Sequence, residues 1–138
     1  MRKTKKWMTS FGSMEDKPAD ILDFARMQLY ALSDEEPASS IALRQVAETI
    51  HLALSSAVEI ATGKAIDQAS NEFKRVRLIA ERLNDPTLPK EFNDLRRLLH
   101  TEAFHGALHP RPGILVALGA ADAMVARILR ARRKTHKK

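Results

Sequence analysis

Apolar side chains occur at every third or fourth position of the stretch Ala47-Glu-Thr-Ile-His-Leu-Ala-Leu-Ser-Ser-Ala-Val-Glu-Ile-Ala61. This spacing is the period of an α-helix, whereas a half-buried strand would alternate apolar and polar residues. The whole apolar stripe comprises Leu43, Val46, Ala47, Ile50, Leu54, Ala57, Val58 and Ala61. It predicts a helix over 37–62, which Pro37 opens and Gly63 ends in a left-handed conformation.

Small residues such as Ala42, Ala53 and Ser55 are frequent along this predicted helix. Small side chains let neighbouring helix axes approach closely, so we expect the helix to lie at the centre of the fold. Ile41 and Leu52 lie off the main stripe, which makes the helix apolar on more than one side. Two interpretations stay open: the helix runs through the middle of a monomer, or a dimer partner covers one of its sides.

The same helical period recurs on both sides of this segment. The other predicted helices cover 18–32, Ser70 to the break at 84–86, 89–105 and 113–133, with a turn over 109–113. Their expected inward residues are Ile21, Leu22, Ala25, Leu29, Leu32, Phe73, Val76, Ala80, Leu83, Phe92, Leu95, Leu99, Ala103, Leu115, Leu118, Val125 and Leu129. No segment alternates with a period of two for more than a few residues. The sequence therefore predicts an all-α fold, a bundle of five helices.

Composition narrows the class of protein. A chain of 138 residues suits one domain, and 44% hydrophobic with 29% charged residues is typical of a folded protein. The absence of cysteine excludes disulfides, thiolate catalysis and cysteine zinc sites. No apolar run approaches the roughly 20 residues that a membrane-spanning helix needs. We expect a cytoplasmic protein that does not bind a membrane, with a helical domain over 13–131 between basic tails at 1–12 and 132–138.

The net charge of +6 is concentrated at the two ends of the chain. Residues 2–6 hold four basic side chains and residues 127–138 hold seven, while the stretch between them is acidic overall. Basic segments attract phosphate chains because binding releases counterions. The alternative is that these lysines and arginines only keep the ends solvated.

The segment with the most chemistry is Leu95-Arg-Arg-Leu-Leu-His-Thr-Glu-Ala-Phe-His-Gly-Ala-Leu-His109. Arg96 and His100 are four residues apart and share one helix face, and Arg97 and His105 lie on roughly neighbouring faces. An arginine that holds a phosphate beside a histidine that moves a proton is a plausible set for RNA cleavage. The alternative is a solvated helix end whose positive side chains suit the negative end of the helix dipole.

Further phosphate contacts are predicted at Arg111, which sits between two prolines on a stiff turn, and at other basic residues. These are His109, Arg130, Arg132, Arg133 and Lys134. Glu102, His105 and His109 have metal-ligand spacing, but Gly106 and Pro110 end the helix before they converge. His51 is expected to be a packed or partly exposed histidine. We therefore expect no metal and no cofactor.

The pattern of 47–61 and 95–105 resembles the HEPN superfamily, the nucleotide-binding helical domain of higher eukaryotes and prokaryotes. The resemblance is strongest to its archaeal PaREP-type branch and spans roughly residues 18–130. Many HEPN members are homodimers that place an Arg-x(4–6)-His motif at the dimer seam and cleave RNA with it. Here His105 would be the histidine and Arg97 the arginine, but seven residues separate the two.

The resemblance implies a homodimer that binds nucleic acid or a nucleotide. The long spacing between Arg97 and His105 predicts that this homodimer lacks efficient catalysis. One alternative is a metal-independent ribonuclease of the toxin type, with Arg97 and His105 as catalytic residues and an antitoxin-like protein as partner. Another is a helical adaptor that binds a protein.

Overall fold

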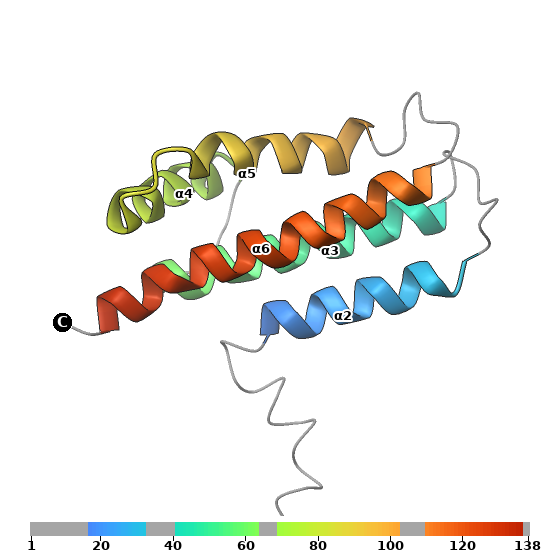
Figure 1. Cartoon of the computed structure of the whole chain (residues 1–138), viewed down its shortest axis with the longest axis horizontal. Helices are drawn as coiled ribbons and strands as arrows, with labels where there is room; N and C mark the ends of the chain where they lie inside the picture. The colour runs from blue at the N-terminus through green and yellow to red at the C-terminus, as the bar shows by residue number, and fades with distance from the viewer. Residues whose placement is uncertain (1–16, 33–40, 64–68, 103–109, 137–138) are drawn as a thin grey trace, which may run out of the picture.

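The computed structural model describes residues 17–32, 41–63, 69–102 and 110–136. They form α2 (Lys17–Tyr30), α3 (Ile41–Thr62), α4 (Ala69–Leu83), α5 (Leu88–Arg97), a π-helical turn η2 (Leu98–Glu102) and α6 (Pro110–His136). No strand occurs among these residues, which confirms the predicted all-α bundle of five α-helices. Figure 1 shows α3 and α6 side by side, with α2 on one side of them and α4 and α5 on the other.

Helix α3 is central, as its apolar stripe predicts. All eight residues of the predicted stripe are buried, and Ala53, Ser56 and Ile60 are buried with them. The helix contacts α2, α4, α6 and η2, so its own chain encloses it on most sides. Ile41 and Leu52, which lie off the stripe, remain exposed.

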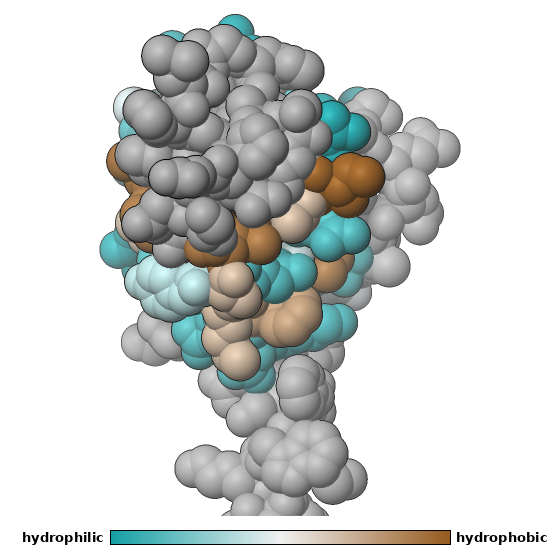
Figure 2. All heavy atoms as spheres, turned by 90° about the vertical axis from the view of Figure 1, so that its right-hand side faces the viewer, coloured by the Kyte–Doolittle hydropathy of each residue, from teal (hydrophilic) through white to brown (hydrophobic). Residues whose placement is uncertain are grey.

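Helix α2 packs on the bundle through Leu22, Ala25 and Leu29, all of them buried. Its Arg26 forms an ion pair with Asp122 of α6 and another with Asp23 at 2.9 Å. The opposite side of α2 exposes large apolar side chains, namely Phe24, Met27 and Tyr30. Figure 2 looks at the end of the bundle where α2 ends and α3 and α6 begin, and hydrophobic patches lie there among hydrophilic ones.

Two residues with positive φ angles end helices where the sequence predicts a stop. Gly63 has φ +77° and its N–H donates to the carbonyl oxygen of Glu59 at 2.7 Å. Asn84, with φ 56°, ends α4 and opens the short turn to α5. Asparagine tolerates this left-handed region better than most residues, because its short polar side chain can bond locally.

The last two helices differ from the sequence-based expectation. The helix expected over 89–105 is α-helical only to Arg97 and continues as η2, and residues 103–105 lie outside the described part of the chain. The turn expected over 109–113 is wrong, because α6 already begins at Pro110. A proline fits the first helical position, where no N–H partner is needed. Leu115, expected inward, is 40% exposed and Ile114 is buried instead.

None of the helices in the described ranges is long and apolar enough to cross a membrane.

Candidate functional site

The predicted site residues fall into two separate regions. Arg96, Arg97 and His100 lie at the end of α5 and in η2. Arg130 lies near the C-terminal end of α6, close enough to Asp85 to lower the pKa of that carboxyl slightly. Arg132, Arg133 and Lys134 follow it in the same helix. Figure 1 shows this end of α6 at the opposite end of the bundle from η2, so the fold does not bring the two groups together.

The remaining predicted residues are placed less fully. His105 and His109 lie outside the described residues, so the pairing of Arg97 with His105 is a prediction that stays open. Arg111 belongs to the first turn of α6 rather than to the stiff loop that its flanking prolines suggested. Arg97 is exposed, and its Nη2 donates to Asp94 at 3.3 Å on the outer side of α5.

Arg96 and His100 do share a face, and that face meets a polar cluster that the sequence analysis did not identify. Its centre is Glu72 in the first turn of α4, whose side chain is 2% exposed. Glu72 Oε1 accepts a hydrogen bond from His51 Nε2 at 3.2 Å, and its Oε2 accepts one from the Ser55 hydroxyl. His51 and Ser55 are four residues apart on α3 and therefore lie on one side of that helix.

The His100 ring completes this arrangement. Its centroid lies 5.0 Å from that of His51, and the two rings meet edge to face at 80°. His100 belongs to η2, and π-helical turns are rare and frequently found at functional sites. We call His51, Ser55, Glu72, Arg96 and His100 the histidine cluster. It joins α3, α4, α5 and η2.

Glu72 and His100 differ in their charge at neutral pH. Burial raises the pKa of Glu72, but hydrogen bonds from His51 and Ser55 and the positive charges of His51 and Arg96 outweigh it, so the pKa lies below its ordinary value. Glu72 is therefore ionised at neutral pH. Burial and the positive charges of His51 and Arg96 lower the pKa of His100, and the negative charges of Glu48 and Glu72 offset this only in part. His100 is therefore neutral at neutral pH.

The cluster is accessible from one side. His51 is 24% exposed, Arg96 is half-buried and His100 is exposed, whereas Glu72 lies beneath them. A guanidinium beside two imidazoles at a solvent-facing edge suits an anion such as a phosphate group. Among the described residues, no three or more His, Asp or Glu side chains are arranged to hold a metal ion.

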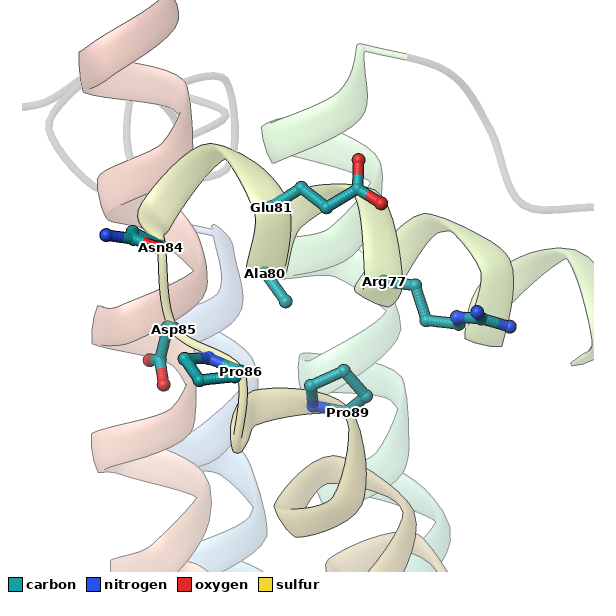
Figure 3. A pocket seen from close by; sticks show the side chains of 7 residues that line it. All are labelled: Arg77, Ala80, Glu81, Asn84, Asp85, Pro86 and Pro89. Atoms are coloured by element: carbon teal, nitrogen blue, oxygen red, sulfur yellow. The ribbon is translucent and has the colours of Figure 1, made fainter.

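A second feature lies away from the cluster, at the junction of α4 and α5. An open hollow of about 300 Å³ is lined there by Arg77, Ala80, Glu81, Asn84, Asp85, Pro86 and Pro89. Figure 3 shows Arg77 extending away from the hollow and the two proline rings facing it. Asp85 is already bonded to Arg127 of α6 at 2.9 Å. The charges that remain have mixed signs, so the hollow offers less specific chemistry than the histidine cluster.

Comparisons of the chain with protein-family models, with curated proteins and with solved structures found no match.

The sequence contains a partial signal for the missed residues. His51 and Ser55 interrupt the apolar pattern of 47–61 on the same helix side, which marks a polar spot on a central helix. Polar groups that face another helix need hydrogen-bond partners, and Glu72 of α4 supplies them here. Which of the 17 acids supplies the partner depends on tertiary packing.

Proposed function

We propose that this protein is an HEPN-like helical homodimer that binds the phosphate groups of RNA or of a nucleotide at the histidine cluster. The observation that supports it best is the accessible edge of the cluster, where the rings of His51 and His100 meet and the positive charge of Arg96 acts on His100. Arg96 contributes a permanent positive charge, and His100 contributes a neutral donor and acceptor. The ionised Glu72 holds His51 and Ser55 of α3 beneath them by hydrogen bonds.

The basic ends of the chain contribute to affinity without adding specificity. Phosphate contacts of this kind are independent of sequence and weaken as salt displaces them. Arg130 and the basic residues after it lie at the other end of the bundle, so a single nucleotide at the cluster would not reach them. A longer RNA that spans the bundle would reach both regions. RNA is therefore expected to bind more tightly than a mononucleotide.

The test is fluorescence anisotropy with labelled single-stranded RNA, at several salt concentrations, with ATP as competitor. Arg96→Ala is expected to weaken binding about tenfold and to reduce the salt dependence by about one phosphate contact. Arg77→Ala is the matched control, because it removes the same charge from an exposed position on α4. Equal effects of the two substitutions would contradict a site at the cluster, and absence of RNA and ATP binding would contradict the function itself.

A further inference from the structure

His100 is a titratable group at the accessible edge of the histidine cluster. Its ring meets the ring of His51 edge to face, with 5.0 Å between the centroids, and Arg96 lies four residues before it on the same chain segment. The positive charges of both neighbours act on His100. A further positive charge at this edge is therefore unfavourable as long as no anion is present.

The charged groups that act on His100 come from every helix around it except α6. They lie on α3, α4 and α5 and are Glu48, His51, Glu72 and Arg96. Helix α6 also contacts η2. Its described charged side chains instead face α2 or the turn between α4 and α5, and they are Asp122, Arg127 and Arg130.

Glu72 and Arg96 provide a constant background of charge around His100. The pKa of Glu72 lies below its ordinary value, so this buried carboxylate stays ionised above about pH 5 and keeps its hydrogen bond from His51 Nε2. Arg96 keeps its positive charge at every accessible pH. Burial and the charges of His51 and Arg96 keep the pKa of His100 below its ordinary value, so His100 is neutral in the free protein near pH 7.

We propose that phosphate binding at the histidine cluster takes up a proton at His100, so that the protein binds RNA more tightly in mildly acidic solution; this inference rests on the proposed function. A phosphate oxygen against Arg96 and His100 brings a negative charge to surroundings that were positive. Protonated His100 then donates a charge-assisted hydrogen bond to the phosphate, which is stronger than the bond from a neutral ring. The coupling is reciprocal, so a proton on His100 favours RNA as much as RNA favours the proton.

The direction of the pH dependence follows from the two states of His100. Binding raises the pKa of His100 from its lowered value in the free protein. The added affinity is therefore complete below the pKa of the free protein and is lost as pH rises through the pKa of the complex. Uptake of one proton changes the dissociation constant by at most about tenfold per pH unit. We expect RNA to bind about three- to tenfold more tightly at about pH 5.5 than at about pH 7.5.

The experiment measures the affinity of the full-length protein for single-stranded oligouridylate by fluorescence anisotropy, between about pH 5 and 8 at constant ionic strength. The RNA has unphosphorylated ends and carries a pH-insensitive dye. Its phosphodiesters and uracil bases do not change charge in this range, so the pH dependence reports on the protein. Isothermal titration calorimetry in two buffers of different ionisation enthalpy measures proton uptake, which is expected to reach a large fraction of one proton per bound RNA.

His100→Gln tests the assignment of the proton, because glutamine keeps a hydrogen-bonding side chain but does not titrate. Its affinity is expected to vary with pH only as far as the other four histidines of the chain cause, an effect that wild type shares. Circular dichroism checks that the variant folds. NMR of the His100 ring in the wild type, with and without the RNA, measures its protonation directly and needs no folded variant.

Glu48→Gln tests the electrostatic origin of the effect. Glu48 is exposed on α3, and its negative charge raises the pKa of His100. Its removal is expected to move the pH range of tighter binding to lower pH, a shift that a merely structural role of Glu48 does not produce. Glu81→Gln removes an exposed carboxylate from the last turn of α4 and is expected to show the pH profile of wild type.

Three results would overturn the inference. RNA binding with the same affinity at every pH and without proton uptake would do so and would leave the proposed function standing. An equal pH dependence in wild type and His100→Gln would place the proton on another group. Absence of RNA binding at every pH would overturn both this inference and the proposed function.

Discussion

Glu72 shows how a single buried charge depends on its neighbours. Its carboxylate is only 2% exposed, and it is held by His51 and Ser55 of α3. Removing a partner from such a group leaves donors without acceptors, and that cost exceeds the net value of the bonds themselves. A substitution of Glu72 on α4 therefore also leaves polar groups of α3 without hydrogen-bond partners.

Glu72→Ala is expected to lower the free energy of unfolding by about 1–3 kcal/mol, because it leaves the Ser55 hydroxyl and His51 Nε2 without their acceptor. Urea denaturation followed by circular dichroism measures this. Glu81→Ala is the control, since it removes an exposed carboxylate from the same helix and is expected to leave the midpoint nearly unchanged. A smaller effect at Glu72 than at Glu81 would contradict the hydrogen bonding described for the cluster.

The stability contribution of Glu72 is also expected to depend on pH in a defined direction. Its pKa is lower in the folded protein than its ordinary value, so its contribution is complete above the unfolded-state pKa and is lost as pH falls through the folded-state pKa. Below about pH 5, where an ordinary imidazole is already protonated, the stability difference between wild type and Glu72→Gln should shrink as the solution is acidified. Urea midpoints of both proteins over this range test it. A difference that grows toward acid pH would contradict the lowered pKa.

At the scale of residues, the sequence predicts contacts within a helix and misses those between helices. Arg96 and His100 could be placed on one face because four residues make about one helical turn. His51 could be recognised as a partly exposed histidine for the same reason. The hydrogen bond between His51 and Glu72 joins residues 21 positions apart on different helices. It forms only because α4 packs against α3.

Helix ends provide a matched pair of glycine substitutions. Gly63 has φ +77° and nothing within 4 Å of the position that a Cβ would occupy, whereas Gly119 lies within α6, also with open space around it. Gly63→Ala is expected to cost about 1 kcal/mol, because alanine does not readily adopt a left-handed conformation. Gly119→Ala is expected to stabilise by up to about 1 kcal/mol through helix propensity. Thermal melts that shift in the same direction for both variants would contradict this assignment.

Arg127 links α6 to the turn between α4 and α5 by hydrogen bonds. Arg127 donates to Asp85 Oδ2 through Nη2 at 2.9 Å and through Nε at 3.2 Å, and it also pairs with Glu91. The hydrogen bond from Arg127 is the main reason that the pKa of Asp85 lies below its ordinary value. The hydrogen bond to Glu91, and after it the one to Asp85, raises the pKa of Arg127 above its ordinary value. This planar, forked contact requires arginine, since lysine presents a single point charge.

Arg127→Lys is therefore expected to lower the free energy of unfolding by about 1 kcal/mol, although the positive charge is kept. Urea denaturation measures the change. Lys90→Ala serves as the control, because the Lys90–Asp94 pair is largely exposed on α5 and is expected to leave the midpoint unchanged. An Arg127→Lys variant as stable as wild type would show that charge alone holds this junction.

At the scale of elements, the sequence predicts amphipathic helices well and their starts less well. The phase of α3 follows from eight apolar residues, each of which is buried. The predicted start of α6 and the predicted inward face of its first turns were wrong. Two prolines and a glycine over 110–113 are typical both of a turn and of a first helical turn. In the structure these residues are helical, Ile114 packs into the core and Leu115 faces outward.

At the scale of the whole molecule, the question left by the sequence was whether a second copy is needed to enclose the central helix. Helix α3 is enclosed mainly by α2, α4, α6 and η2 of its own chain, so its burial does not require a partner. Among the described residues, two of the large exposed apolar side chains, Ile41 and Leu52, lie on α3 itself, and three lie on one side of α2. Exposed apolar groups gathered in this way are typical of association surfaces.

The proposed homodimer is therefore expected to use α2. Phe24, Met27 and Tyr30 are 55%, 67% and 64% exposed, and they recur every three residues along the helix. Light scattering at micromolar concentration should give twice the monomer mass of 15.5 kDa for wild type. Met27→Glu should return the mass to that of the monomer, because it places a charge in the apolar contact and disturbs no buried side chain. Glu59→Gln, on the half-buried side of α3, is expected to remain dimeric. A wild-type mass equal to the monomer would contradict the homodimer, and a dimeric Met27→Glu would move the interface away from α2.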